Sequence, residues 1–140
     1  MEEKVYEVYE EVKEIIEYFI EKFIKKFNNV KVKTTDDNKI IISTKLPKII
    51  NDAVIRVKYY ENKTRTFIDI WDKENPFTLE IDMEEKILIT AKNIRKVSTD
   101  YDDDLDCTVI YISATISRIK VIIDLNAFEY MQPFIFLVFS

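Results

Sequence analysis

None of the 140 residues is glycine, and none is histidine. Ordinary amino-acid usage of about 7% would place roughly ten glycines in a chain of this length. Sites that hold phosphate in a tight loop depend on glycine, because the backbone there approaches the ligand closely or adopts positive φ. The sequence therefore excludes the P-loop, dinucleotide-binding and kinase-type nucleotide sites. Without histidine, the most frequent general base and metal ligand, most familiar enzyme chemistry is not expected.

Cysteine is nearly absent as well, since Cys107 is the single one. One cysteine cannot form an internal disulfide, which fits a reducing compartment. The opening residues are acidic and do not resemble a secretory signal. The longest unbroken apolar run, residues 134–139, is far shorter than the roughly 20 residues that a membrane helix needs. We therefore expect a cytoplasmic protein with no membrane partner.

The composition also bears on the source of the chain. Ile, Lys, Glu, Asp, Asn, Tyr and Phe are frequent, and Ala, Arg and Pro are scarce. The frequent residues mostly have AT-rich codons, and high Ile, Lys and Glu with almost no Gln also matches hyperthermophile usage. An archaeal virus or mobile element fits this composition, and a virus of an AT-rich mesophile would look similar.

Residues 3–27 carry the strongest periodic signal. Apolar side chains recur at steps of three and four residues, which predicts an amphipathic helix. Acidic residues crowd its first half and lysines its last turns, as the helix dipole favours. Asn28 and Asn29 then follow where a C-terminal glycine would usually lie.

From residue 30 onward the pattern changes to short β-rich runs divided by Asn, Asp and Pro. Short connections at 36–38, 61–64 and 82–85 predict hairpins whose turns depend on Asn and Asp. The predicted fold class is therefore α+β, a single domain over 1–140 with one long N-terminal amphipathic helix packed on a largely antiparallel multi-stranded sheet. The predicted strands are 30–34, 39–45, 53–60, 65–71, 77–81, 86–91, 107–116, 118–125 and 134–139.

Basic residues are concentrated early in the predicted sheet. Residues 30–65 hold nine Lys and Arg against four acids. Strand alternation places these side chains opposite the apolar ones, and a basic face that bears tyrosine can hold single-stranded nucleic acid. The residues of this candidate face are Lys31, Lys33, Arg56, Lys58 and Tyr60. The sequence pI of about 4.9 favours the other interpretation, lysines on an ordinary solvent face.

Five aspartates lie within seven positions of residues 100–106, namely Asp100, Asp102, Asp103, Asp104 and Asp106. Three of them match the first ligands of an EF-hand loop, but Leu105 lies where the turn needs glycine and Tyr111 where the closing glutamate belongs. We therefore expect no metal. The segment is predicted to be a mobile surface loop, and its charge could dock it on a basic partner.

Carboxylates alone can support hydrolysis in some enzymes. Candidates on or beside adjacent predicted strands are Asp69, Asp72, Glu80 and Asp82. Their spacing is not distinctive, because acidic side chains are usual on the solvent face of an antiparallel sheet. Cys107 has no histidine to activate it, and its strand pattern predicts a buried, inert thiol.

These observations favour a non-enzymatic binding protein without a cofactor, which engages a host macromolecule through the acidic loop. Nucleic-acid binding is the first alternative, and a carboxylate- or metal-dependent hydrolase is the second. One helix can cover only one face of a sheet, so apolar surface is left over. A homodimer would bury that surface. The residues predicted for its interface are Tyr6, Tyr18, Phe134, Phe136 and Val138.

Overall fold

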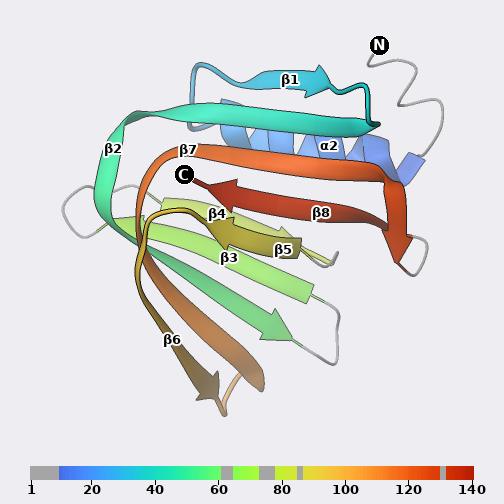
Figure 1. Ribbon diagram of the computed structural model, residues 1–140. Helices are drawn as coiled ribbons and strands as arrows, with labels where there is room; N and C mark the ends of the chain where they lie inside the picture. The colour runs from blue at the N-terminus through green and yellow to red at the C-terminus, as the bar shows by residue number, and fades with distance from the viewer. Residues whose placement is uncertain (1–9, 61–64, 73–77, 85–86, 130–131) are drawn as a thin grey trace.

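The computed structural model describes residues 10–60, 65–72, 78–84, 87–129 and 132–140. In this part of the chain it has one helix, α2 (Glu10–Ile24), and one eight-stranded sheet (Figure 1). The strands are β1 (Lys31–Thr34), β2 (Lys39–Tyr60), β3 (Arg65–Asp72), β4 (Thr78–Met83), β5 (Ile87–Ala91), β6 (Ile94–Asp102), β7 (Cys107–Glu129) and β8 (Gln132–Phe139). The fold is therefore mainly β, and the predicted α+β class is wrong.

The predicted helix over residues 3–27 is only partly present. The described helix ends at Ile24, followed by a turn in which the Phe27 amide donates to the Phe23 carbonyl at 2.7 Å. Residues 3–9 lie outside the described part of the chain. The apolar spacing nevertheless identified the buried face correctly, because Val12, Ile16, Phe19 and Phe23 are all buried.

Two long strands, β2 and β7, form the centre of the sheet and pair antiparallel along most of their length. Each was predicted as two strands, with breaks near Pro47 and Ser117. Instead β2 continues through register shifts between Lys45, Ile50 and Ala53. A proline is tolerated at such an irregularity because no ladder hydrogen bond is required of its nitrogen. Both strands bend sharply here, so the sheet has two halves that differ in direction (Figure 1).

The halves contain different neighbours of β2 and β7. One half has β1 beside β2, with β8 and β5 beyond β7, and the other has β3 and β4 beyond β2, with β6 beside β7. The predicted hairpin at 82–85 is wrong, because β4 pairs with β3 and β5 pairs in parallel with β8. The other described pairings are antiparallel, as expected.

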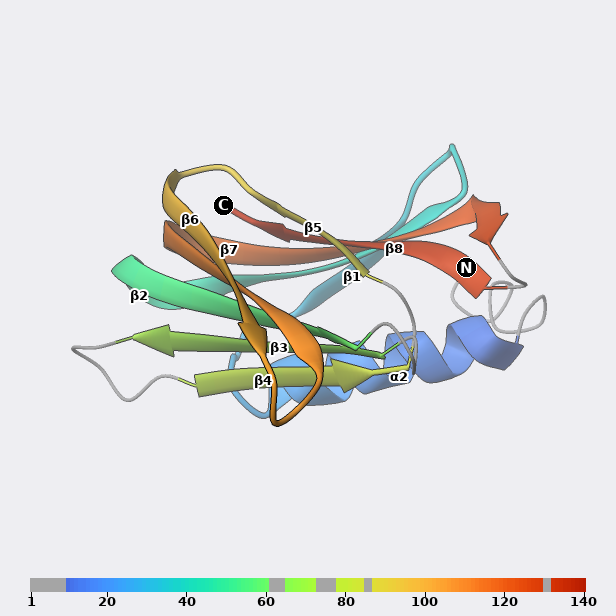
Figure 2. The same ribbon diagram turned by 90° about the horizontal axis from the view of Figure 1, so that it is seen from below.

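The core lies on the concave side of the bent sheet. Helix α2 lies on the same side of β7 and β8 as β3 and β4 do (Figure 2). A single hydrophobic cluster joins the helix to the inner residues of both halves, for example Phe19, Ile55 and Leu137. The helix therefore fills the space inside a folded sheet, and does not form a separate layer. The chain is mainly β because its strands contain most of the described residues, whereas the helix contains 15.

The missing glycines are replaced at two tight turns. Asn38, between β1 and β2, has φ of 57°, and Asp106, between β6 and β7, has φ of 52°. Asn and Asp tolerate this left-handed region better than other residues with a β-carbon. The prediction that turns here would depend on Asn and Asp is confirmed for the connection at 36–38.

Candidate binding surfaces

One face of the half formed by β1, β2, β7, β8 and β5 points away from the core. Along residues 39–46 of β2 the side chains alternate between buried and more exposed positions, and the buried ones face α2. We call the opposite side the outer face; in Figure 2 it is the side of β5, β8 and β7 turned away from α2. The described part of the chain has one helix, and it lies on the concave side. The outer face is thus open in the described structure.

A row of apolar side chains crosses the outer face. Strand register places Ile41 beside Ile122, Ile122 beside Phe136, and Phe136 beside Leu88. Leu88 is 45% exposed, and the other three are half-buried. Phe134 lies two residues from Phe136 on the same face, with 6.5 Å between ring centroids and 52° between ring planes. The row is therefore a contiguous apolar surface with two aromatic rings.

Cationic side chains flank this row. Register places Lys33 beside Ile41, Lys120 beside Ser43, and Arg118 beside Lys45. Among the described strand residues the face carries six cations and one carboxylate, that of Asp124. The cations are Lys31, Lys33, Lys39, Lys45, Arg118 and Lys120. Within the described residues only Lys39 of these six forms an ion pair, at 3.4 Å from Asp37. A chain of net charge -5 thus has a locally basic outer face.

The predicted nucleic-acid set does not form one surface. Lys31 and Lys33 belong to the outer face, whereas the other three lie in the other half of the sheet. There Arg56 donates to the buried Asp69 carboxylate at 2.8 Å, which raises the pKa of Arg56. The ammonium of Lys58 lies 5.4 Å from the Phe67 ring centroid. Burial raises the pKa of Tyr60. These side chains contact neighbours within the chain.

The acidic segment forms a hairpin with a tight turn, so its description as a loop is wrong for residues up to Asp102. Among the described strands β6 pairs only with β7, and it lies at an edge of the sheet (Figure 1). Strand β6 and the turn at 103–106 are exposed, apart from the partly exposed Asp102. We call β6, this turn and residues 107–114 of β7, which pair with β6, the acidic hairpin.

Side-chain hydrogen bonds order the tip of the acidic hairpin. Asp102 Oδ1 accepts from the Leu105 amide at 3.1 Å, and the Tyr101 hydroxyl donates to Asp106 Oδ1. The bond to Asp106 is the main reason that the pKa of Tyr101 is raised to about 12. Four large apolar side chains of the hairpin are exposed, namely Ile94, Val97, Tyr101 and Leu105. The hairpin therefore offers both carboxylates and apolar contacts in one defined shape.

The candidate catalytic carboxylates lie close in register but differ in their surroundings. Asp69 is opposite Glu80 on neighbouring strands, and Asp69 is held by Arg56. The Asp82 backbone carbonyl accepts from the Tyr18 hydroxyl at 3.1 Å, and the Asp82 amide donates to the same hydroxyl at 2.9 Å. For Asp72 the structure gives only the backbone pairing with Ala53. The arrangement brings a carboxylate pair to β3 and β4, but with an arginine already bound to one of them.

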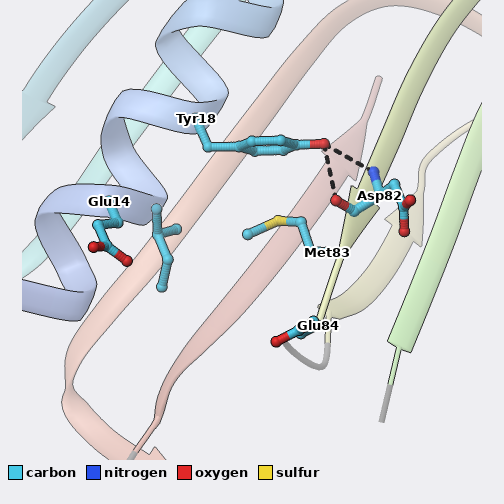
Figure 3. A pocket seen from close by; sticks show the side chains of 6 residues that line it. Glu14, Tyr18, Asp82, Met83 and Glu84 are labelled. Carbon is cyan, nitrogen blue, oxygen red and sulfur yellow. Dashed lines mark hydrogen bonds between the residues drawn. The ribbon is translucent and has the colours of Figure 1, made fainter. Parts of the chain in front are cut away.

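A small cavity of about 230 Å³ lies between α2 and the end of β4 (Figure 3). Tyr18, Asp82 and Met83 line it, together with two exposed acids, Glu14 and Glu84. The Tyr18 ring spans from the helix to β4 and ends in the two hydrogen bonds to Asp82. Tyr18 therefore links the helix to the sheet edge.

The other predicted residues are placed as follows. Phe134, Phe136 and Val138 lie on the outer face, and Tyr6 lies outside the described residues. Cys107 is buried, as its strand pattern predicted. Sequence reasoning did not find the contributions of Arg118, Lys120 and Leu88 to the outer face. The alternation of Arg118, Lys120, Ile122 and Asp124 along one strand was the available signal.

The described residues lack two further features. They contain no helix with the length and hydropathy that a membrane crossing requires. They also contain no group of three or more Cys, Asp or Glu side chains placed to hold a metal ion. Comparisons of the chain with protein-family models, with curated proteins and with solved structures find no match.

Proposed function

We propose that this chain is a non-enzymatic binding protein and that its acidic hairpin docks on a basic surface of a protein partner. The observation that supports the proposal is the exposed hairpin tip, where five aspartates surround exposed Tyr101 and Leu105. Aspartates steer a basic partner into contact, and desolvated aromatic and apolar side chains supply most of the binding energy at protein interfaces.

The ordered turn supports docking because less conformational entropy is lost on binding. The Asp102 and Asp106 side chains form hydrogen bonds within the turn, and Asp103 and Asp104 form no ion pair with the described residues. A compositional link to an archaeal virus or mobile element would make the partner a host protein, in the host cytoplasm. No specific contact favours the carboxylate hydrolase as a second candidate.

The test is affinity capture from an extract of the native host with two charge-matched variants. Replacing Asp102, Asp103 and Asp104 by Asn removes three charges, while an amide oxygen at 102 can still accept from Leu105. The control replaces the exposed Glu17, Asp36 and Glu80 by their amides.

The expected result is a protein captured by the wild type and the control and lost with the hairpin variant. Recovery should also fall as salt rises, since exposed charges are screened. Equal capture by all three proteins would show that the hairpin is not the docking element. The same test with Leu105→Ala separates the apolar contribution from charge.

A further inference from the structure

We propose that the outer face binds single-stranded nucleic acid. This surface is distinct from the acidic hairpin, and the inference does not depend on the hairpin docking on a protein. It also differs from the set predicted from sequence, of which only Lys31 and Lys33 lie on the outer face.

Aromatic rings supply the first argument. Phe134 and Phe136 present neighbouring half-buried rings on the open side of β8. Rings on an open sheet face are the usual platform on which unpaired bases stack, and stacking tolerates any base because each has a π-face. Ile41, Ile122 and Leu88 extend the platform across three further strands. A strand with splayed bases can therefore lie across several β-strands.

Charge supplies the second argument, since six cations flank this platform and one carboxylate lies among them. Lys33 lies at the β1 end of the apolar row, and the next two rows on one side of it hold the cations Lys31, Lys120, Lys45 and Arg118. Lys39 and Asp124 lie on the other side. Five of the six cations form no ion pair within the described residues. Phosphates that follow a strand of stacked bases would meet these unpaired cations along one side of the row. The chain as a whole is acidic, so the local excess of cations is complementary to a polyanion.

The same charges disfavour a second copy of this chain as the occupant. A two-fold symmetric interface brings the same patch of both protomers together. Here it would bring the six cations of one copy against the six of the other, which is repulsive at low salt. An anionic partner removes that repulsion. Flat, half-buried rings also suit stacking better than insertion into a lipid surface, which needs apolar groups immersed by several ångströms.

The experiment measures fluorescence anisotropy of labelled oligothymidylate and oligouridylate, each of about 20 nucleotides. We expect binding at low salt that weakens as salt rises, with a logarithmic slope no steeper than about -4 for six cations. A duplex of the same length should bind at least about tenfold more weakly, because its bases are not free to stack. Equal affinity for the duplex would overturn the single-stranded assignment.

Two sets of variants locate the site. Phe136→Leu keeps an apolar side chain but removes the aromatic face, so oligonucleotide affinity should fall about 5- to 100-fold. Phe136→Tyr keeps the aromatic face and should retain most of the affinity. The double variant Lys33→Ala, Lys120→Ala should make the salt slope shallower by about 1.4. The charge-matched control Lys58→Ala, Lys96→Ala, in the other half of the sheet, should leave the slope nearly unchanged.

Each alternative occupant has a defined result. Binding to vesicles of phosphatidylcholine and phosphatidylserine, unaffected by Phe136→Leu and without oligonucleotide binding, would overturn the proposal in favour of a membrane surface. A stable dimer at low salt that excludes the oligonucleotides would overturn it in favour of a second copy. Circular dichroism of every variant establishes that it is folded. If Phe136→Leu is unfolded, the lysine variant alone decides, since its side chains are on the surface.

Discussion

The two faces of β7 and β8 show how alternate residues of the same strands meet different environments. On the inner face, Ile119, Val121 and Leu137 are completely buried. On the outer face, Lys120, Ile122 and Phe136 stand between them and are only half-buried. The outer residues of β8, Phe134, Phe136 and Val138, are all apolar, although a sheet with one open side usually has polar residues there.

Apolar residues of the same strands therefore have two different roles. Apolar residues on the inner face stabilise the fold, because they are removed from water on folding. Apolar residues on an open face gain less on folding, and a contiguous patch of them is a common feature of interaction surfaces. A run such as residues 134–139 contains both kinds, so its hydrophobicity alone cannot distinguish them.

The largest expected effect contrasts two phenylalanines of β8. Phe139 is 1% exposed, and Phe139→Ala should lower the free energy of unfolding by about 3–5 kcal/mol. Phe136→Ala on the outer face should cost only about 1–2 kcal/mol, because less of its ring leaves water on folding. Urea unfolding of both variants measures the difference. Equal losses would mean that the outer face is covered in solution.

The second prediction concerns the other half of the sheet, where Arg56 and Asp69 form an ion pair on the face opposite the core. The Asp69 side chain is 4% exposed, and its partner Arg56 is 44% exposed. Arg56→Met leaves this carboxylate buried without its cation, and should cost about 2–3 kcal/mol, less than for a fully buried pair.

A matched variant gives the control for this ion pair. Adding Asp69→Asn to Arg56→Met removes the unpaired charge and should recover part of the lost stability. Thermal unfolding at neutral pH measures both. If the double variant is no more stable than the single one, the charge of Asp69 is not the source of the loss.

Local features of the fold were predictable from sequence. The spacing of Val12, Ile16 and Phe19 identified the buried helix face, and Asn38 was assigned to a turn. Both depend on neighbours within a few residues. The burial of Cys107 followed from strand alternation in the same way.

Long-range pairing was not predictable in this way. The sequence predicts a strand that ends at Lys45, shortly before Pro47, but register shifts near the proline allow β2 to continue and bend. The parallel pairing of β5 with β8 joins segments that are far apart in the sequence. The outer face depends on the continuous β2 and on the parallel pairing of β5 with β8. Leu88 lies beside Phe136 only through this parallel pairing. Its residues were visible in the sequence, but their register was not.

The third prediction concerns the homodimer predicted from the sequence, for which we expect a smaller effect. It tests whether the outer face is free in solution. Contact through Phe134, Phe136 and Val138 would bring the cations of two copies together, so salt should strengthen it. We expect light scattering to give the 16.8 kDa chain mass at low salt and a shift toward twice that mass only at high salt. Phe136→Asp should abolish the shift. A dimer that dissociates as salt rises would place the contact elsewhere, for example between the acidic hairpin and the outer face.

The smallest effect concerns the acidic hairpin, where the hydroxyl of the exposed Tyr101 has a hydrogen-bond partner. The hydrogen bond to the Asp106 carboxylate raises the pKa of Tyr101 from 10.0 to about 12. The protonated phenol is the donor, so the folded pKa lies above the unfolded one. The stabilisation of the turn is therefore complete below about pH 10 and is lost as pH rises through about 12.

A pH titration of the Tyr101 ring by NMR measures this pKa directly. Asp106→Asn should return the pKa toward 10, whereas Asp104→Asn, the control in the same turn, should change it little. Titration of wild-type Tyr101 near pH 10 would show that the hydrogen bond does not persist in solution and that the tip is less ordered than the proposed docking requires.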